Sequence, residues 1–244
     1  GYANRTSDDR RRSQGMLKIK PRYAIYFAPH DQSQLARFGE MALKRTPNAQ
    51  DTELGPVFAG DLDRHKVLAA FPRHYGFHAT MKAPFEMREN TSVGDLENAL
   101  AEFCERYSPV PLNGLQPAAM AGFIALVCKP SEPLTRLAFN AVEAFEPFRA
   151  PLTDYDIRRR KPETLSPAAR HYFGKFGYPY VGDLFKFHMT LSGQIEPDFY
   201  QFLKHYFNKI VTDPLALDCL SLFWQPHREA PFVRIASWPL TGDQ

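Results

Sequence analysis

Two short segments of this sequence carry the same residue types at the same spacing. Each reads Phe-His-x-Thr followed by a large apolar residue: the first contains His78 and Thr80, the second contains His188 and Thr190, and the histidines lie 110 positions apart. Apolar and polar residues alternate through both segments, which predicts strands with one buried face. Because residues two apart on a strand project from the same face, each motif presents a histidine beside a threonine.

A pair of such histidines suits in-line cleavage of a phosphodiester. Imidazole titrates near neutral pH, so a neutral histidine can take a proton from the attacking water or hydroxyl while a protonated one gives a proton to the leaving oxygen. The threonine hydroxyls can donate to the non-bridging oxygens, and Lys82 and Lys186, which flank the motifs, can offset the developing negative charge. A single strand histidine is usually an ordinary hydrogen-bonded residue; the matched pair favours catalysis. Which histidine is the acid and which the base is not predicted.

Longer strings resemble the 2H phosphoesterase superfamily, which is named for two His-x-Thr/Ser motifs. The strings are Tyr-Gly-Phe-His-Ala-Thr-Met-Lys-Ala-Pro-Phe at 75–85, Phe-Arg-Ala-Pro-Leu at 148–152, Gly-Tyr-Pro-Tyr-Val at 177–181 and the second motif. They are similar to the bacterial branch linked to phosphonate-degradation operons, over residues 22–195. The resemblance implies an α+β bilobal fold with two pseudo-symmetric antiparallel sheets and outer helices, which face each other across a central cleft holding both motifs. It also implies a cyclic phosphodiesterase activity.

Several arginines are candidates for contact with a second charged group on a substrate. Arg158 and Arg159 begin a run of four basic residues after Phe-Arg-Ala-Pro-Leu, which is either a solvated loop or part of a phosphate-binding lid. Arg73 precedes the first motif in a predicted turn, where it is either a phosphate ligand or an ordinary surface arginine.

Three tyrosines are candidates for contact with a sugar or base. Tyr178 and Tyr180 lie in a loop with glycine and proline before the second motif, and Tyr26 lies on the first predicted strand. An aromatic ring in these places can stack on a ligand, but packing in the core is an equally good interpretation of each.

Hydrophobic periodicity predicts the elements that position these residues. Apart from the two motifs, strands are expected at 22–29, 123–128, 215–224 and 232–238, and helices at 32–44, 92–103, 132–145 and 197–209. A loop rich in Asp, Gly and Pro is expected up to Gly60, and irregular structure over 154–183. Pro72 and Gly76 argue against a helix just before the first motif.

Composition indicates a globular protein. Of the 244 residues, 44% are hydrophobic, with 20 Phe and 11 Tyr. We expect a disordered tail over residues 1–20 and a single bilobal domain over 21–244. Residues 1–22 hold seven basic and two acidic residues, so the net charge of +3 for the whole chain leaves −2 for the rest. The globular part therefore gives no strong electrostatic case for polyanion binding.

The cysteines and the hydropathy of the sequence indicate the cellular compartment in which the protein is expected. The three cysteines are scattered without a Cys-x-x-Cys pair, so neither a disulfide framework nor a zinc ribbon is indicated and a reducing cytoplasm is expected. No apolar run approaches the length that spans a bilayer, so no membrane association is expected.

No metal or other cofactor is expected. His-Glu-x-x-His is absent, and Asp61, Asp63 and His65 are interpreted as loop and cap residues. His74 and His78 would converge only on a helix. The loops of nucleotide triphosphatases and the nucleophile elbow of serine hydrolases are also absent.

The sequence therefore predicts a metal-independent phosphoesterase that hydrolyses a cyclic phosphodiester. In it His78 and His188 are the acid/base pair, and Thr80 and Thr190 hold the phosphoryl oxygens. The resemblance points to a small ribose-type cyclic phosphate in phosphonate catabolism. Two alternatives remain open: an RNA-end 2′,3′-cyclic phosphodiesterase, and a non-catalytic phosphosugar- or nucleotide-binding module. The oligomeric state is not predicted.

Overall fold

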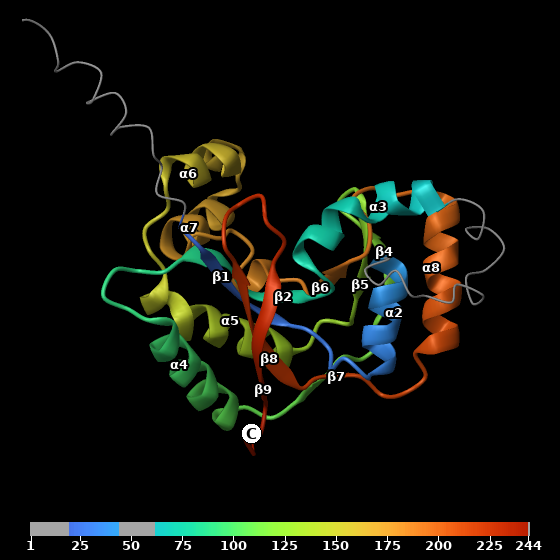
Figure 1. The fold of residues 1–244 in the computed structure, drawn as a ribbon, viewed down its shortest axis with the longest axis horizontal. Coiled ribbons are helices and arrows are strands. Elements are labelled where there is room, and N and C mark those ends of the chain that lie inside the picture. The colour runs from blue at the N-terminus through green and yellow to red at the C-terminus, as the bar shows by residue number, and fades with distance from the viewer. Residues whose placement is uncertain (1–19, 44–61, 244) are drawn as a thin grey trace, which may run out of the picture.

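The computed structural model describes residues 20–43 and 62–243 (Figure 1). The predicted tail over residues 1–19 and the predicted loop up to Gly60 lie outside the described residues. In chain order the elements are β1 (Arg22–Phe27), α2 (Gln34–Leu43), α3 (Leu62–Tyr75), β2 (Ala79–Glu86), α4 (Val93–Arg106), β3 (Val110–Pro111), β4 (Gln116–Met120), β5 (Phe123–Val127), α5 (Glu132–Phe145), η2 (Glu146–Phe148), α6 (Asp154–Arg160), η3 (Pro162–Thr164), α7 (Pro167–Phe176), η4 (Gly182–Leu184), β6 (His188–Thr190), α8 (Pro197–Ile210), β7 (Ala216–Leu217), β8 (Cys219–Gln225) and β9 (Val233–Pro239).

The described part of the chain is built around one seven-stranded sheet, in the order β4-β5-β6-β2-β1-β8-β9, with β3 and β7 paired separately. Every pairing is antiparallel. The α+β class with a large antiparallel sheet is therefore confirmed. The structure differs from the expectation of two separate facing sheets, because β2 and β6 pair at Ala79 and Met189 and join the two halves edge to edge. This pairing satisfies backbone groups that two open edges would leave without partners.

Helices surround the sheet in three groups. In Figure 1, α4 and α5 lie at the lower left, α6 and α7 at the upper left, and α2, α3 and α8 on the right. α5 packs on β2, α4 on β8 and β9, and α8 on β4, while α2 contacts both α3 and α8. The predicted helices at 32–44, 92–103, 132–145 and 197–209 correspond to α2, α4, α5 and α8.

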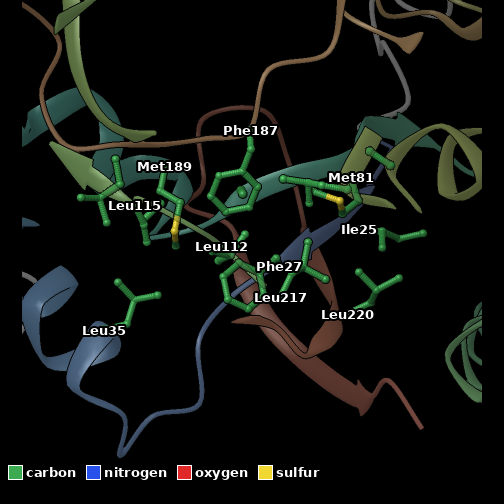
Figure 2. Packing of buried hydrophobic residues seen from close by; sticks show 14 of the residues in the cluster. Ile25, Phe27, Leu35, Met81, Leu112, Leu115, Phe187, Met189, Leu217 and Leu220 are labelled. Carbon is green, nitrogen blue, oxygen red and sulfur yellow. The ribbon is translucent and has the colours of Figure 1, made fainter. Parts of the chain in front are cut away.

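The apolar residues of the motif strands form the centre of the main core (Figure 2). Met81 and Met189 belong to the same buried cluster as Ile25 and Phe27 of β1, and Phe187 joins them from just before β6. All five are at most 5% exposed. Burial of side chains this large is the main stabilising contribution to such a sheet. It leaves the opposite face of the motif strands to the polar residues.

The helix α3 corrects the prediction that Pro72 and Gly76 exclude a helix before the first motif. Proline has no N–H and cannot bond to the carbonyl four residues earlier. Here that carbonyl, of Leu68, accepts instead from the N–H of Gly193, just after the second motif strand. Gly76, at φ 84°, ends the helix with its N–H on the Pro72 carbonyl. Asp63 and His65, which we interpreted as loop or cap residues, lie within α3.

The stretch 154–183, expected to be irregular, contains the helices α6 and α7. Thr153 begins α6 with a capping box, in which its hydroxyl accepts from the Asp156 N–H and the Asp156 carboxylate accepts from the Thr153 N–H. Ser166 caps α7, and Gly177, at φ 70°, ends it. Such caps stabilise helix ends, and α7 also buries Ala169, Phe173 and Phe176 on one face.

None of the helices between residues 20 and 43 or between 62 and 243 has both the length and the apolar character that crossing a bilayer requires.

Candidate active site

The register between β2 and β6 places the two motifs side by side. Ala79 pairs with Met189, and both side chains are buried in the core. Directly opposite residues of an antiparallel pair share a face, and their neighbours point to the other face. Residues 78 and 80 therefore share the non-core face with residues 188 and 190, and each histidine lies opposite the threonine of the other motif. The two histidines are diagonal neighbours, a relation that separates residues by about 7–8 Å and their Cβ atoms by somewhat less.

Both histidine rings make the same backbone hydrogen bond. His78 Nδ1 lies 2.9 Å from the Gly76 carbonyl oxygen, and His188 Nδ1 lies 2.8 Å from the Lys186 carbonyl oxygen. A carbonyl can only accept, so Nδ1 carries the proton in each ring. The repeated sequence thus fixes the same tautomer twice, with Nε2 as the nitrogen that can accept or release a proton. Thr80 Oγ1 lies 3.3 Å from His78 Nε2.

Aromatic rings hold both imidazoles in place. The Tyr26 ring stacks on His78, with centroids 3.7 Å apart and an interplanar angle of 20°. Tyr26 pairs with Thr80 across β1 and β2, so it belongs to the same face as the motif residues. Its burial raises the pKa of its hydroxyl well above the ordinary value, so the phenol stays neutral. His188 packs against Phe123, with centroids 5.9 Å apart.

His78, Thr80, His188 and Thr190 all line one cavity of about 310 Å³. Its wall includes the end of α3, parts of α6 and α7, and Arg228 from the turn after β8. The charged residues of the lining are the arginines Arg22, Arg149, Arg159, Arg160 and Arg228 and the carboxylates Glu86 and Asp156. Five arginines against two carboxylates give the cavity an excess of three formal positive charges, which favours an anionic ligand.

Two of these arginines are neutralised by carboxylates. Arg228 donates to both oxygens of Asp156, at 2.8 and 3.1 Å, and to Glu86 at 3.2 Å. These bonds lower the pKa of Asp156 although its burial acts the other way. Arg149 makes a bidentate pair with Glu146, with bonds of 2.6 and 3.0 Å to Oε1. The pairs fix α6 and the start of the 149–152 segment against the sheet.

Of the predicted substrate-binding residues, the structure brings Tyr26, Arg159 and Tyr178 to this cavity. The guanidinium of Arg160 lies over the Tyr178 ring, 5.4 Å from its centroid. Burial raises the pKa of Tyr178 to about 12, so it too stays protonated.

The structure contradicts the prediction that Lys82 faces the motif histidines. Along β1, Tyr26 pairs with Thr80 and Ile25 pairs with Lys82, so β2 has a bulge between its two partners. A bulge shifts the alternation by one residue, which turns Lys82 to the core side with Ile25. There its ammonium donates to Val142 O at 3.1 Å and to Glu146 Oε2 at 2.5 Å. Lys82 is 2% exposed and does not line the cavity.

The remaining four predicted residues lie outside the cavity lining. Arg73 is in the last turn of α3, not in a turn before the motif, and Arg158 is exposed on α6. Lys186 is exposed, and its contribution is the carbonyl that accepts from His188. Tyr180 is 48% exposed and packs edge-on against Tyr178.

Sequence reasoning missed four arginines that line the cavity: Arg22, Arg149, Arg160 and Arg228. Arg22 had a local signal, because on β1 it shares a face with Ala24 and Tyr26. Arg160 belongs to the basic run at 158–161 and Arg149 to the Phe-Arg-Ala-Pro-Leu string, so the sequence singles out both segments without identifying these two residues as candidates. Arg228 comes from a distant segment, and no spacing in the sequence relates it to the motifs.

Across the described residues, His, Cys, Asp and Glu side chains nowhere form a group of three or more that could hold a metal ion.

The protein is therefore of the α+β class. Its two His-x-Thr motifs lie on adjacent antiparallel strands and line one arginine-rich cavity. Residues 80–233 match the family described as "Protein of unknown function (DUF1045)". The chain belongs to this family. The match begins inside the first motif, at Thr80, and contains the second motif completely.

Two curated relatives are similar along most of this chain. The protein named "Ribose 1,5-bisphosphate phosphokinase PhnN" of Janthinobacterium sp. (strain Marseille) is 31% identical over 232 residues, which cover 91% of this chain and 51% of that protein. The protein of the same name from Laribacter hongkongensis (strain HLHK9) is 30% identical over 217 residues, which cover 86% of this chain and 50% of that protein. The chain spans about half the length of the curated relatives it matches.

Among solved structures, the crystal structure of TT0787 from Thermus thermophilus is similar over 91% of this chain and 100% of its own, with 14% identity and a TM-score of 0.43.

Proposed function

We propose that this chain is a phosphoesterase that hydrolyses a small cyclic phosphodiester by a two-histidine acid/base mechanism. The observation that carries the proposal is the diagonal placement of two histidines on paired strands, each with Nδ1 held by the carbonyl two residues earlier. Nε2 is then the nitrogen of each ring that can accept or release a proton, and both histidines line one cavity with both threonines.

The reaction consumes one water. Nε2 of one histidine takes a proton from the water as its oxygen forms a bond to phosphorus. The ester bond on the opposite side breaks, and Nε2 of the second histidine gives its proton to the leaving oxygen. The product is a phosphate monoester with one freed hydroxyl, and the two rings have exchanged protonation states. Thr80 and Thr190 donate to the non-bridging oxygens, where negative charge develops.

A phosphorylated ribose is the substrate class that we favour. The cavity volume of about 310 Å³ suits a small molecule, and its arginine excess suits a ligand with several negative charges. The names of the relatives refer to ribose 1,5-bisphosphate, and the motif strings resemble a branch linked to phosphonate breakdown. A phosphokinase catalyses a different reaction, and this sequence contains no Gly-x-x-x-x-Gly-Lys loop.

The test is turnover of a panel of cyclic phosphates in the presence of EDTA. The panel contains a ribose 5-phosphate bearing a cyclic phosphate, ribose cyclic phosphates without the 5-phosphate, and oligonucleotides ending in a 2′,3′-cyclic phosphate. We expect hydrolysis of the first, abolished by His78→Ala and by His188→Ala. Preference for the oligonucleotide ends would move the function to RNA. Binding without turnover across the panel would identify a binding module and refute the enzyme.

A further inference from the structure

Arg22 is a buried cation with no anionic partner in the part of the chain that the structure describes. Its side chain is 8% exposed, and its Nε donates to Gln225 Oε1 at 2.8 Å. The terminal guanidinium nitrogens make no hydrogen bond within the described residues, and the residue lines the cavity. Burial of a guanidinium without a counter-ion is costly, so such a group in a cavity indicates an anion-binding role.

The surroundings of Arg22 hold the guanidinium in place without neutralising it. Gln225 is completely buried and is itself fixed, because its amide nitrogen donates to the carbonyls of Arg228 and Ala230 at 3.0 and 2.7 Å. The guanidinium also lies 5.5 Å from the centroid of the Phe232 ring. With its Nε edge held by Gln225, Arg22 presents its terminal amino groups as a prearranged fork of donors.

The carboxylate directly across the strand pair from Arg22 is bound to another arginine. Glu86 is the cross-strand partner of Arg22, but its side chain accepts from Arg228. Burial lowers the pKa of Arg22, and the positive charges of Arg228 and Arg159 lower it further. Arg159 also lines the cavity and has no ion pair among the described residues. Two arginines without an ion pair among the described residues therefore line the same cavity.

The position of Arg22 is separate from that of the histidine pair. Arg22 lies four residues before Tyr26 on β1, a distance of about 13 Å along the strand, and both project to the same face. Tyr26 stacks on His78, so it marks the reacting end of the cavity. The reach of the arginine side chain shortens the gap, and a ligand of the size of a phosphorylated pentose can connect the two ends.

We propose that Arg22 and Arg159 form a second anion subsite in this cavity, which binds a phosphate monoester carried by the substrate away from its cyclic phosphate. The identity of the substrate in this inference rests on the proposed function, whereas the existence of the anion subsite does not. It makes Arg22 a residue that selects substrates with a second phosphate over otherwise equal substrates without one.

The test measures binding of ribose 5-phosphate, with ribose as the uncharged control, by titration calorimetry. The titrations use the full chain with His188→Ala, so that the histidine end contributes little. Arg22→Gln is expected to weaken ribose 5-phosphate binding at least tenfold, equivalent to about 1.4 kcal/mol. Arg158→Gln removes an exposed arginine of α6 outside the cavity and serves as the matched control, with an expected change within twofold. Unchanged affinity in Arg22→Gln would overturn the proposal.

Two further measurements separate ligand binding from a structural role. An arginine retained for its Gln225 bond would lower the melting temperature when replaced and leave affinity unchanged, which would also overturn the subsite. If Arg22→Gln does not fold, the test is made with Arg159→Gln, which changes an exposed residue. This variant should bind ribose 5-phosphate severalfold more weakly, and wild-type affinity in this variant would refute the subsite. Arginine-dependent binding without hydrolysis of any cyclic phosphate would support the subsite while refuting the proposed function.

Discussion

Lys82→Met separates the role predicted for this lysine from the role that the structure gives it. Its ammonium is buried against Val142 O and Glu146, on the core side of β2. Burial lowers the pKa of Lys82 from 10.5 to about 8, because the hydrogen bond to Glu146 only partly offsets the loss of solvation. At about 1.4 kcal/mol per pH unit, this difference is worth about 3 kcal/mol.

The free energy of unfolding changes with pH in the direction set by the protons that the folded and unfolded chains bind. Between pH 8 and 10.5 the unfolded chain keeps the Lys82 proton and the folded chain has released it, so the free energy of unfolding of the wild type rises with pH relative to Lys82→Met. We expect a relative gain of about 2–3 kcal/mol across this window. Near pH 7 the variant should lose at most about 2 kcal/mol, since Val142 O loses a donor while Glu146 keeps Arg149.

The assay is urea unfolding of both proteins at pH 7, 8, 9 and 10.5, with kcat/KM measured near pH 7. Lys186→Met is the control, because it removes the exposed lysine that flanks the other motif and no buried contact. For Lys82→Met, kcat/KM should stay within about twofold. A flat stability difference, or a tenfold loss of activity in a folded Lys82→Met protein, would refute the structural interpretation.

The other predictions concern the backbone and hydroxyl groups of the motifs. Gly76→Ala places a side chain at φ 84° and should lower the free energy of unfolding, measured in urea, by about 1–2 kcal/mol. It should also lower kcat, because the Gly76 carbonyl orients His78. The control is Gly174→Ala on α7, where an added Cβ meets no atom within 4 Å, and this variant should not be destabilised. Thr80→Val and Thr190→Val keep the side-chain shape but remove a phosphoryl donor, so each should lower kcat/KM about 10²-fold, and wild-type rates in either would exclude that role.

Local patterns in the sequence predict most of the elements and the core. The alternation up to Met81 and around Met189 separates the buried face from the polar face, although Lys82 departs from it, and the apolar periodicity of α4 and α5 predicts their helices. These features depend on neighbours in the sequence, and so the sequence shows them directly.

The errors arise where distant segments decide the outcome. Pro72 is compatible with a helix only because Gly193 satisfies the Leu68 carbonyl, and nothing in the local sequence indicates that partner. Lys82 leaves the polar face because of a bulge in its pairing with β1.

The cavity arginines show the same limit. Arg228 reaches the site through ion pairs with Glu86 and Asp156, which lie 142 and 72 positions away in the sequence. By contrast, Tyr26 is a candidate from the sequence, where ligand contact and core packing are equally good interpretations, and the structure brings it to the cavity.

The most direct test of the two-histidine mechanism is a double-mutant cycle of His78→Ala and His188→Ala, with kcat/KM for the cyclic phosphate on ribose 5-phosphate measured in EDTA. If the two imidazoles act on one phosphorus centre as a unit, each single change should lower kcat/KM about 10²- to 10⁴-fold, and the double change should cost little more than either alone. Losses that multiply as independent effects, or a single variant that keeps wild-type activity, would contradict this mechanism.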